Sequence, residues 1–81
     1  MDRNEVENRL RSLVGSHLNI DPERVVLTSV LEDLARDSMQ TVELICRVER
    51  EFGKILPNSF LQPTLTFAEL LNGVVLLNGV A

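Results

Sequence analysis

The segment from residue 38 to residue 52 carries the strongest helical pattern in the sequence, and it limits what the chain can fold into. Its apolar residues recur at the spacing of an α-helix, and Asp37 before it and Gly53 after it are typical capping residues. The apolar stripe comprises Val42, Ile45, Val48 and Phe52, widened by Met39, Leu44 and Cys46. A stripe this wide indicates burial against more than one neighbour. We therefore predict a helix over 38–52, with Cys46 as a small core residue.

A second helix is predicted over residues 3–14. Asp2 is placed to cap this helix, and the acid three residues later is placed to bond back to it. One apolar stripe at helical spacing contains Val6, Leu10, Leu13 and Val14. Gly15 follows this stripe, and glycine often ends helices. We therefore expect the helix to stop at Gly15.

The C-terminal third is predicted to hold a short helix over 57–62 and a longer helix over 67–77. Prolines at both ends of the first segment leave room for little more than one helical turn. Thr66, with Glu69 three residues later, matches a capping box at the start of the longer helix. Together the four segments predict an all-α four-helix bundle with a short third helix.

Residues 15–37 form a long connection between the first two helices. Within it, the sequence DPE at 21–23 is typical of a turn or a short helical start. Apolar residues are spread through this connection, namely Ile20, Val25, Leu27, Val30, Leu31 and Leu34. Because so many apolar side chains do not suit a solvated linker, we expect them to pin the connection to the core. A helical turn is expected around residues 30–34.

The C-terminus contains the sequence LLNGV twice, at 70–74 and at 76–80, with no charged residue after Glu69. Asn-Gly between apolar residues is also typical of a β-hairpin. We favour the helix because the capping box defines its start. The apolar end is available to pack against the bundle or to serve as a partner surface.

Length and composition exclude several classes of protein. The 81 residues suit a single domain, 1–81, and are too few for a deep catalytic cleft. The net charge of −4 disfavours nucleic acid as a partner. Cys46 is the only cysteine, so no internal disulfide can form, and a reducing compartment is favoured. The N-terminus lacks a signal-like apolar core and no apolar run can span a membrane, so we expect a cytoplasmic protein. We also expect it to be a monomer.

Ser38 stands at the start of the predicted helix 38–52 and allows two interpretations. Asp and Ser commonly start helices, so capping alone would explain this pair of residues. Alternatively, the Ser38 hydroxyl is an attachment point presented at the helix tip. Hydrolase chemistry is disfavoured because there is no Gly-x-Ser-x-Gly elbow and His17 is the single histidine. One Cys and one His do not make a metal site, so we predict neither a metal nor an enzyme activity.

Residues 37–57 are similar to the prosthetic-group region of acyl carrier proteins. Those proteins have Asp-Ser-Leu at the start of their second helix, where this chain has DSM at 37–39. The family's Thr-Val-Glu-Leu corresponds to TVEL at 41–44, and its Glu-x-Glu-Phe corresponds to EREF at 49–52. The following ILP at 55–57 resembles the family's Ile-Pro. With the four helices and the long first connection, the likeness extends over most of the chain.

The resemblance implies a carrier that catalyses nothing itself. Ser38, flanked by Asp37 and Met39, would hold 4'-phosphopantetheine through a phosphodiester formed by a phosphopantetheinyl transferase. The thiol of this group would carry acyl intermediates for fatty acid, lipid or polyketide biosynthesis. The other implied partners are acyl-processing synthases with basic docking patches. Those patches would recognise Asp37, Glu43 and Glu49.

The chain departs from the family pattern in three places. Met39 replaces the usual Leu, Arg36 adds a positive charge beside the site, and Gln40 occupies a position that is often acidic. The segment 38–54 holds three acidic and three basic residues, so it is near neutral. Arg47 lies four residues from a glutamate on either side, and such local pairs would explain the charges as a solvated helix face. A specialised rather than housekeeping carrier is compatible with these departures.

Two other functions remain open. A carrier of aminoacyl or peptidyl groups more often has Gly-His or a similar pair before the serine, so Asp37 disfavours it. A carrier-like fold that is never modified would act only as an interaction module, with its apolar C-terminal tail as the binding surface.

Overall fold

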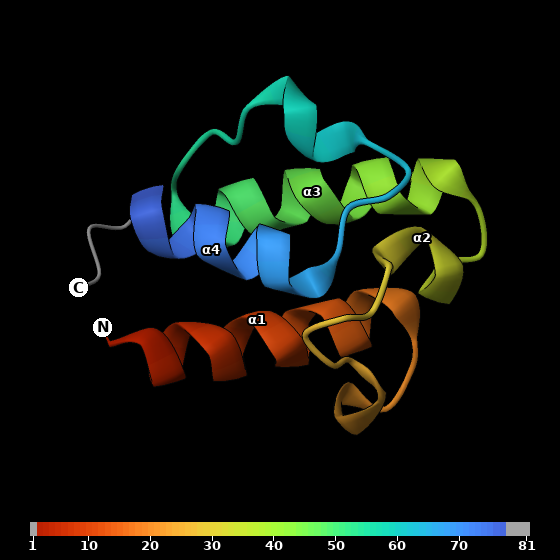
Figure 1. The fold of residues 1–81 in the computed structure, drawn as a ribbon, viewed down its shortest axis with the longest axis horizontal. Coiled ribbons are helices and arrows are strands. Elements are labelled where there is room, and N and C mark those ends of the chain that lie inside the picture. Colours follow the sequence, from red (N-terminus) through yellow and green to blue (C-terminus); the bar gives the residue numbers. More distant parts are fainter. Residues whose placement is uncertain (1, 78–81) are drawn as a thin grey trace.

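The computed structural model describes residues 2–77, and these form the predicted all-α bundle. The elements in chain order are α1 (Arg3–Leu18), the 3₁₀ helix η1 (Pro22–Arg24), α2 (Leu31–Leu34), α3 (Ser38–Phe52), the 3₁₀ helix η2 (Asn58–Leu61) and α4 (Phe67–Leu77). α1 packs against both α3 and α4. In Figure 1 the three long helices lie side by side, and α2 lies next to the N-terminal end of α3.

Helices α3 and α4 have the bounds that the sequence predicts, because their starts are defined by local hydrogen bonds. The Asp37 carboxylate accepts a hydrogen bond from the backbone N–H of Gln40 at 2.9 Å. At the start of α4, the Thr66 N–H donates to Glu69 Oε1 at 2.9 Å, and the Glu69 N–H donates to Thr66 Oγ1 at 3.2 Å. These reciprocal bonds form the predicted capping box. The predicted short third helix is η2.

The core is aliphatic apart from one aromatic ring, that of Phe67. Its buried side chains are Val6, Leu10, Leu13, Val14, Leu18, Val25, Leu31, Leu44, Ile45, Val48, Leu56, Leu65, Phe67, Leu70, Leu71, Val74 and Val75. They come from α1, α3 and α4 and from the connections between them, so one cluster joins the whole bundle. Burial of this apolar surface is the main force that holds the helices together.

The predicted end of α1 at Gly15 is wrong. The helix continues to Leu18, and Asn19, with φ of 60°, adopts the left-handed conformation that ends it. Gly15 is buried instead, and a Cβ there would lie 3.0 Å from both the Ile20 carbonyl oxygen and the Pro22 ring. The glycine therefore lets the following connection pack closely against α1.

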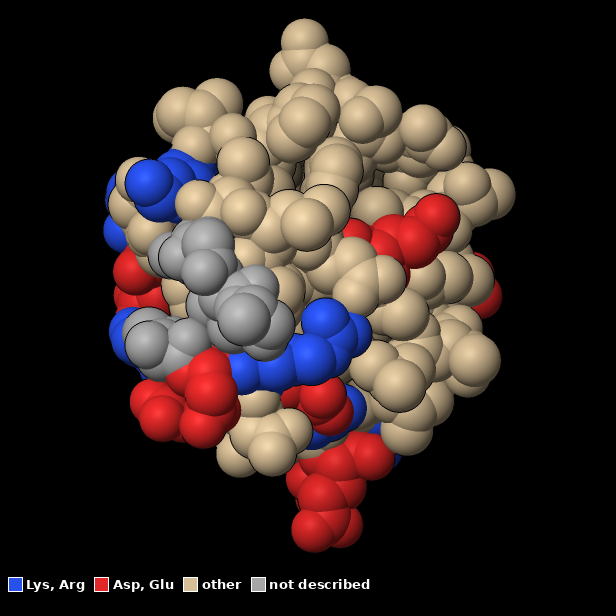
Figure 2. All heavy atoms as spheres, turned by 60° about the vertical axis from the view of Figure 1, so that its left-hand side comes forward, with Lys and Arg blue, Asp and Glu red and all other residues tan. Residues whose placement is uncertain are grey.

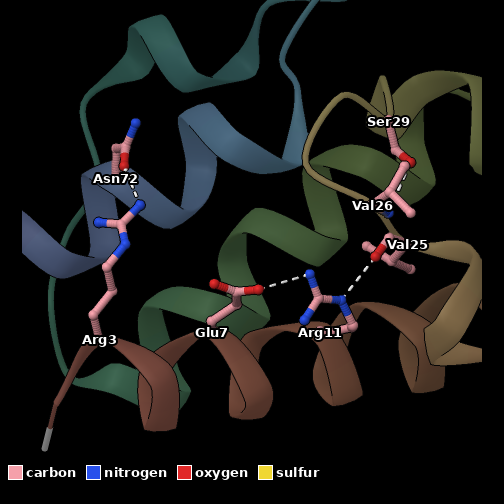
Figure 3. Close-up of polar contacts among 7 residues, drawn as sticks. All are labelled: Arg3, Glu7, Arg11, Val25, Val26, Ser29 and Asn72. Carbon is pink, nitrogen blue, oxygen red and sulfur yellow. Dashed lines mark hydrogen bonds and ion pairs between the residues drawn. The ribbon is translucent and has the colours of Figure 1, made fainter.

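The long connection, which begins at Asn19, is attached to the core mainly as predicted. Val25 and Leu31 are buried, whereas Leu27 is 46% exposed, so its predicted place in the core is wrong. Figure 3 shows Arg11 of α1 holding this segment: its Nε donates to the Val25 carbonyl at 2.8 Å, and a second nitrogen contacts Glu7 at 2.9 Å. The predicted helical turns are η1 and α2.

The end of the described chain is helical, so the hairpin alternative at Asn72-Gly73 is wrong. α4 runs through both residues to Leu77. Figure 3 shows Arg3 of α1 donating to the Asn72 side chain, at 2.8 Å. Most of the second copy of LLNGV lies outside the described residues. Between residues 55 and 77 the only charged residue is Glu69, and Figure 2 shows a largely uncharged upper surface.

Candidate functional site

The candidate site lies at the N-terminal tip of α3. Asp37 is the N-cap, and Ser38 is the first helical residue. Because the Asp37 side chain accepts the hydrogen bond from the Gln40 N–H, the capping side chain is that of Asp37 and not that of Ser38. The Ser38 side chain is exposed, and within residues 2–77 its hydroxyl makes no hydrogen bond. The hydroxyl is therefore accessible to a partner.

The electrostatic surroundings of Ser38 favour an anion. Backbone N–H groups in the first turn of a helix have no intrahelical partner, and the helix dipole adds positive potential there. Arg36 lies beside the tip with a side chain that is 74% exposed. Its Nε is 3.8 Å from Asp37 Oδ2, a loose contact that leaves the guanidinium available to a second anion.

Gln40, which the sequence marked as a departure from an often acidic position, is a buried member of the site. It is 8% exposed, and its Oε1 accepts a hydrogen bond from the backbone N–H of Arg36 at 2.6 Å. Its Nε2 donates to the carbonyl oxygen of His17, in the last turn of α1, at 3.4 Å. A glutamine three residues after an N-cap is typical of a capping box, which was the available signal. In a capping box this side chain would accept from the backbone N–H of the N-cap, Asp37, whereas here it accepts from that of Arg36, one residue earlier.

Thr41 is buried one turn after Ser38. It is 5% exposed, and its Oγ1 has no hydrogen-bond partner within the described chain. The sequence placed Thr41 in the family-like TVEL segment but did not predict that the hydroxyl would be left unpaired. Since a buried unpaired hydroxyl costs free energy, this is a point of local instability beside the site.

Three residues expected in the wide apolar stripe of α3 lie on the surface instead. Met39 is 63% exposed and Val42 is 37% exposed. Cys46 is also exposed, so the prediction that Cys46 is a core residue is wrong. At about 100° per residue, these positions share an arc with Ser38. The buried residues of α3 lie on the other side of the helix. Apolar surface therefore lies next to the Ser38 hydroxyl.

The predicted recognition acids occupy different environments. Asp37 caps α3, and Glu43 is exposed. The Glu49 carboxylate is half-buried and accepts a hydrogen bond from the Leu56 N–H at 2.7 Å, so it fastens the connection after α3. The structure thus places two of these acids on the open surface and gives Glu49 an internal contact.

The predicted local pairs of Arg47 with glutamates on either side are absent from residues 2–77. Glu51 instead contacts Arg9 of α1 at 3.3 Å. Arg50 and Lys54, near the C-terminal end of α3, are exposed and form no ion pair with any described residue. Tertiary packing has therefore replaced the helix-local pairing.

A family model described as "Phosphopantetheine attachment site" matches residues 8–73, which include the whole of α3 and the connections on either side of it. The chain belongs to this family. The match confirms the resemblance of residues 37–57 and assigns a covalent 4'-phosphopantetheine to the domain.

Curated relatives identify the chain as a member of the acyl carrier protein family. Acyl carrier proteins from Afipia carboxidovorans and from Rhodopseudomonas palustris strain TIE-1 are 39% and 38% identical to it. The acyl carrier protein of Bradyrhizobium sp. strain ORS 278 is also 38% identical. Each alignment spans 66 residues, which is 80% of this chain and 84% of the relative. Proteins of this family are carriers and not enzymes.

The residues at the tip of α3 fit the prosthetic group of an acyl carrier protein. An exposed hydroxyl without an internal partner is available for a phosphodiester, and the helix N-terminus and Arg36 complement the charge of a phosphate. Among the described helices, none is both long enough and apolar enough to cross a membrane. No group of three or more His, Cys, Asp and Glu side chains in residues 2–77 is placed to hold a metal ion.

Proposed function

We propose that Ser38 is the attachment point of 4'-phosphopantetheine in this acyl carrier protein. This proposal rests on one observation: the Ser38 hydroxyl is exposed at the start of α3 and does not cap the helix, because Asp37 does. Ser38 also lies inside the matched span, 8–73. The bound group supplies a thiol on which acyl intermediates are held as thioesters.

The neighbours of Ser38 have distinct parts in this proposal. Asp37 fixes the start of α3 through its bond to the Gln40 N–H, and the helix N-terminus that it defines favours an anion such as a phosphate. Arg36 supplies a flexible cation on the same side. Met39 and Val42 present the apolar contact surface on which a partner enzyme docks.

The partners are the phosphopantetheinyl transferase and acyl-processing enzymes of fatty acid, lipid or polyketide assembly. Glu43 is an exposed acid that a basic docking patch on a partner can contact. Arg50 and Lys54 add positive charge farther along α3. Because Glu49 already holds the Leu56 N–H, it contributes less to recognition than its position suggests. This mixed surface supports a specialised carrier, served by partners whose docking patches carry both signs of charge. A cytoplasmic location remains a prediction from the sequence.

Intact mass after incubation with coenzyme A and a broad-specificity phosphopantetheinyl transferase tests the attachment site. We expect the wild-type chain to gain the mass of one phosphopantetheine and Ser38→Ala to gain nothing. Ser12→Ala is the matched control, because Ser12 is also exposed on a long helix, and it should be modified fully.

Circular dichroism shows whether each variant is folded. A gain on Ser38→Ala would place the attachment elsewhere. A folded wild type that gains no mass would contradict the proposal and would favour the unmodified interaction module.

A further inference from the structure

We propose that Gln40 is a positioning residue for the modification of Ser38, an inference that rests on the proposed function. Its side-chain amide connects the backbone just before Ser38 to the end of α1 through two hydrogen bonds. By holding residues 36–38 against α1, it presents the Ser38 hydroxyl to the transferase in one orientation.

The first step of the argument is the bond to Arg36. Residues 35–37 lie between α2 and α3, where the Ala35 N–H donates to the Leu31 carbonyl of α2 and Asp37 caps α3. The Arg36 N–H donates to Gln40 Oε1 at 2.6 Å, which is short for an N–H···O hydrogen bond. This bond, together with the cap bond between Asp37 and the Gln40 N–H, encloses Ser38 in a closed loop of contacts.

The second step is the bond to α1. The last four carbonyls of a helix have no intrahelical donor, and the His17 carbonyl is one of these. Gln40 Nε2 satisfies it at 3.4 Å. The same side chain therefore places the attachment loop relative to a helix that belongs to the rigid core.

The third step is burial. Gln40 is 8% exposed, although glutamine is usually a surface residue. Burying a side-chain amide costs little free energy when its oxygen and its nitrogen are both hydrogen-bonded, as they are here. An acidic residue at this position could accept from the Arg36 N–H but could not donate to the His17 carbonyl. The amide is therefore the group that can make both contacts at once.

The experiment compares the kinetics of phosphopantetheine transfer to the wild type, Gln40→Ala and Gln40→Glu. For Gln40→Ala we expect the kcat of modification to fall about fivefold while KM changes little, because the docking surface is intact. Gln40→Glu retains the acceptor for Arg36, so its kcat should lie between the other two. Gln62→Ala is the matched control, since Gln62 is an exposed glutamine at the end of η2, and its kinetics should equal those of the wild type.

Amide hydrogen exchange supplies a readout that does not depend on the transferase. Exchange at Arg36 should accelerate in Gln40→Ala and stay slow in Gln40→Glu. Val6→Ala removes core volume far from the site and controls for a general loss of stability, so it should leave both Arg36 exchange and kcat unchanged.

Three results would overturn the inference. The first is a kcat of modification in Gln40→Ala equal to that of the wild type. The second is a fall in kcat in Val6→Ala as large as the fall in Gln40→Ala. The third is a Gln40→Glu variant that is as slow as Gln40→Ala while its Arg36 amide remains protected. If the wild type is modified normally and one of these results appears, only the role of Gln40 fails. If a folded wild type gains no phosphopantetheine at all, the proposed function fails with it.

Discussion

The aromatic ring of Phe60 lies against the backbone of Gly73, so that η2 rests on α4 at the one position of that helix without a side chain. A Cβ at residue 73 would lie 2.3 and 2.4 Å from two ring carbons of Phe60. Glycine in a helix interior normally costs about 1 kcal/mol relative to alanine. This glycine is explained by the close approach of η2, which carries the connection between α3 and α4.

Gly73→Ala should reveal this contact because its effect on the free energy of unfolding should have opposite signs in the wild type and in a Phe60→Ala background. In the wild type, overpacking costs about 1–3 kcal/mol and outweighs the helix propensity of alanine, so we expect a net loss of stability. In a Phe60→Ala background the obstacle is gone, and the same change should stabilise the protein by about 0.5–1 kcal/mol. Urea unfolding of the four proteins measures both effects. Stabilisation in both backgrounds would show that the ring moves aside at no cost.

Thr41→Val should stabilise the protein. The substitution keeps the shape of the side chain and removes a buried hydroxyl that has no partner among the described residues. The expected gain is about 1 kcal/mol in the free energy of unfolding, measured by urea denaturation. Thr64→Val is the control, because Thr64 is exposed and should give a change close to zero. A loss of stability in Thr41→Val would mean that the hydroxyl is hydrogen-bonded in solution.

Glu49→Ala should loosen the connection after α3. The carboxylate accepts a hydrogen bond from the Leu56 N–H at 2.7 Å, and Leu56 is buried, so its N–H would be left without this acceptor. We expect a loss of about 1–3 kcal/mol in unfolding free energy and faster amide exchange at Leu56. Glu43→Ala, at an exposed acid on the same helix, should leave both unchanged. Equal effects of the two substitutions would argue that Glu49 acts only as a surface charge.

Features that depend on near neighbours in the chain could be predicted from the sequence. The bounds of α3 follow from the cap at Asp37 and the positive φ of Gly53, and the start of α4 follows from the pairing of Thr66 with Glu69. The position of Ser38 at a helix tip follows from the same local signals. Such features rest on hydrogen bonds that span three or four residues, and the residue types alone specify them.

Features that depend on distant segments could not be predicted. Gly15 resembles a helix stop, but it is buried under the connection that folds back over α1. Cys46 resembles a core residue, but it is exposed, outside the buried set of α3. Periodicity shows that a helix has an apolar side, and it does not show how much of that side the neighbouring helices cover.

The local sequence thus determined the bounds of α3 and α4 in this acyl carrier protein and placed Ser38 at the start of α3. The tertiary structure decided which polar groups surround that serine. Gln40 meets the His17 carbonyl, and Glu51 meets Arg9, only after α1 has packed against α3. The reason is physical: a side chain can bond to any donor or acceptor within reach, and across a bundle only the packing of the core brings such groups together.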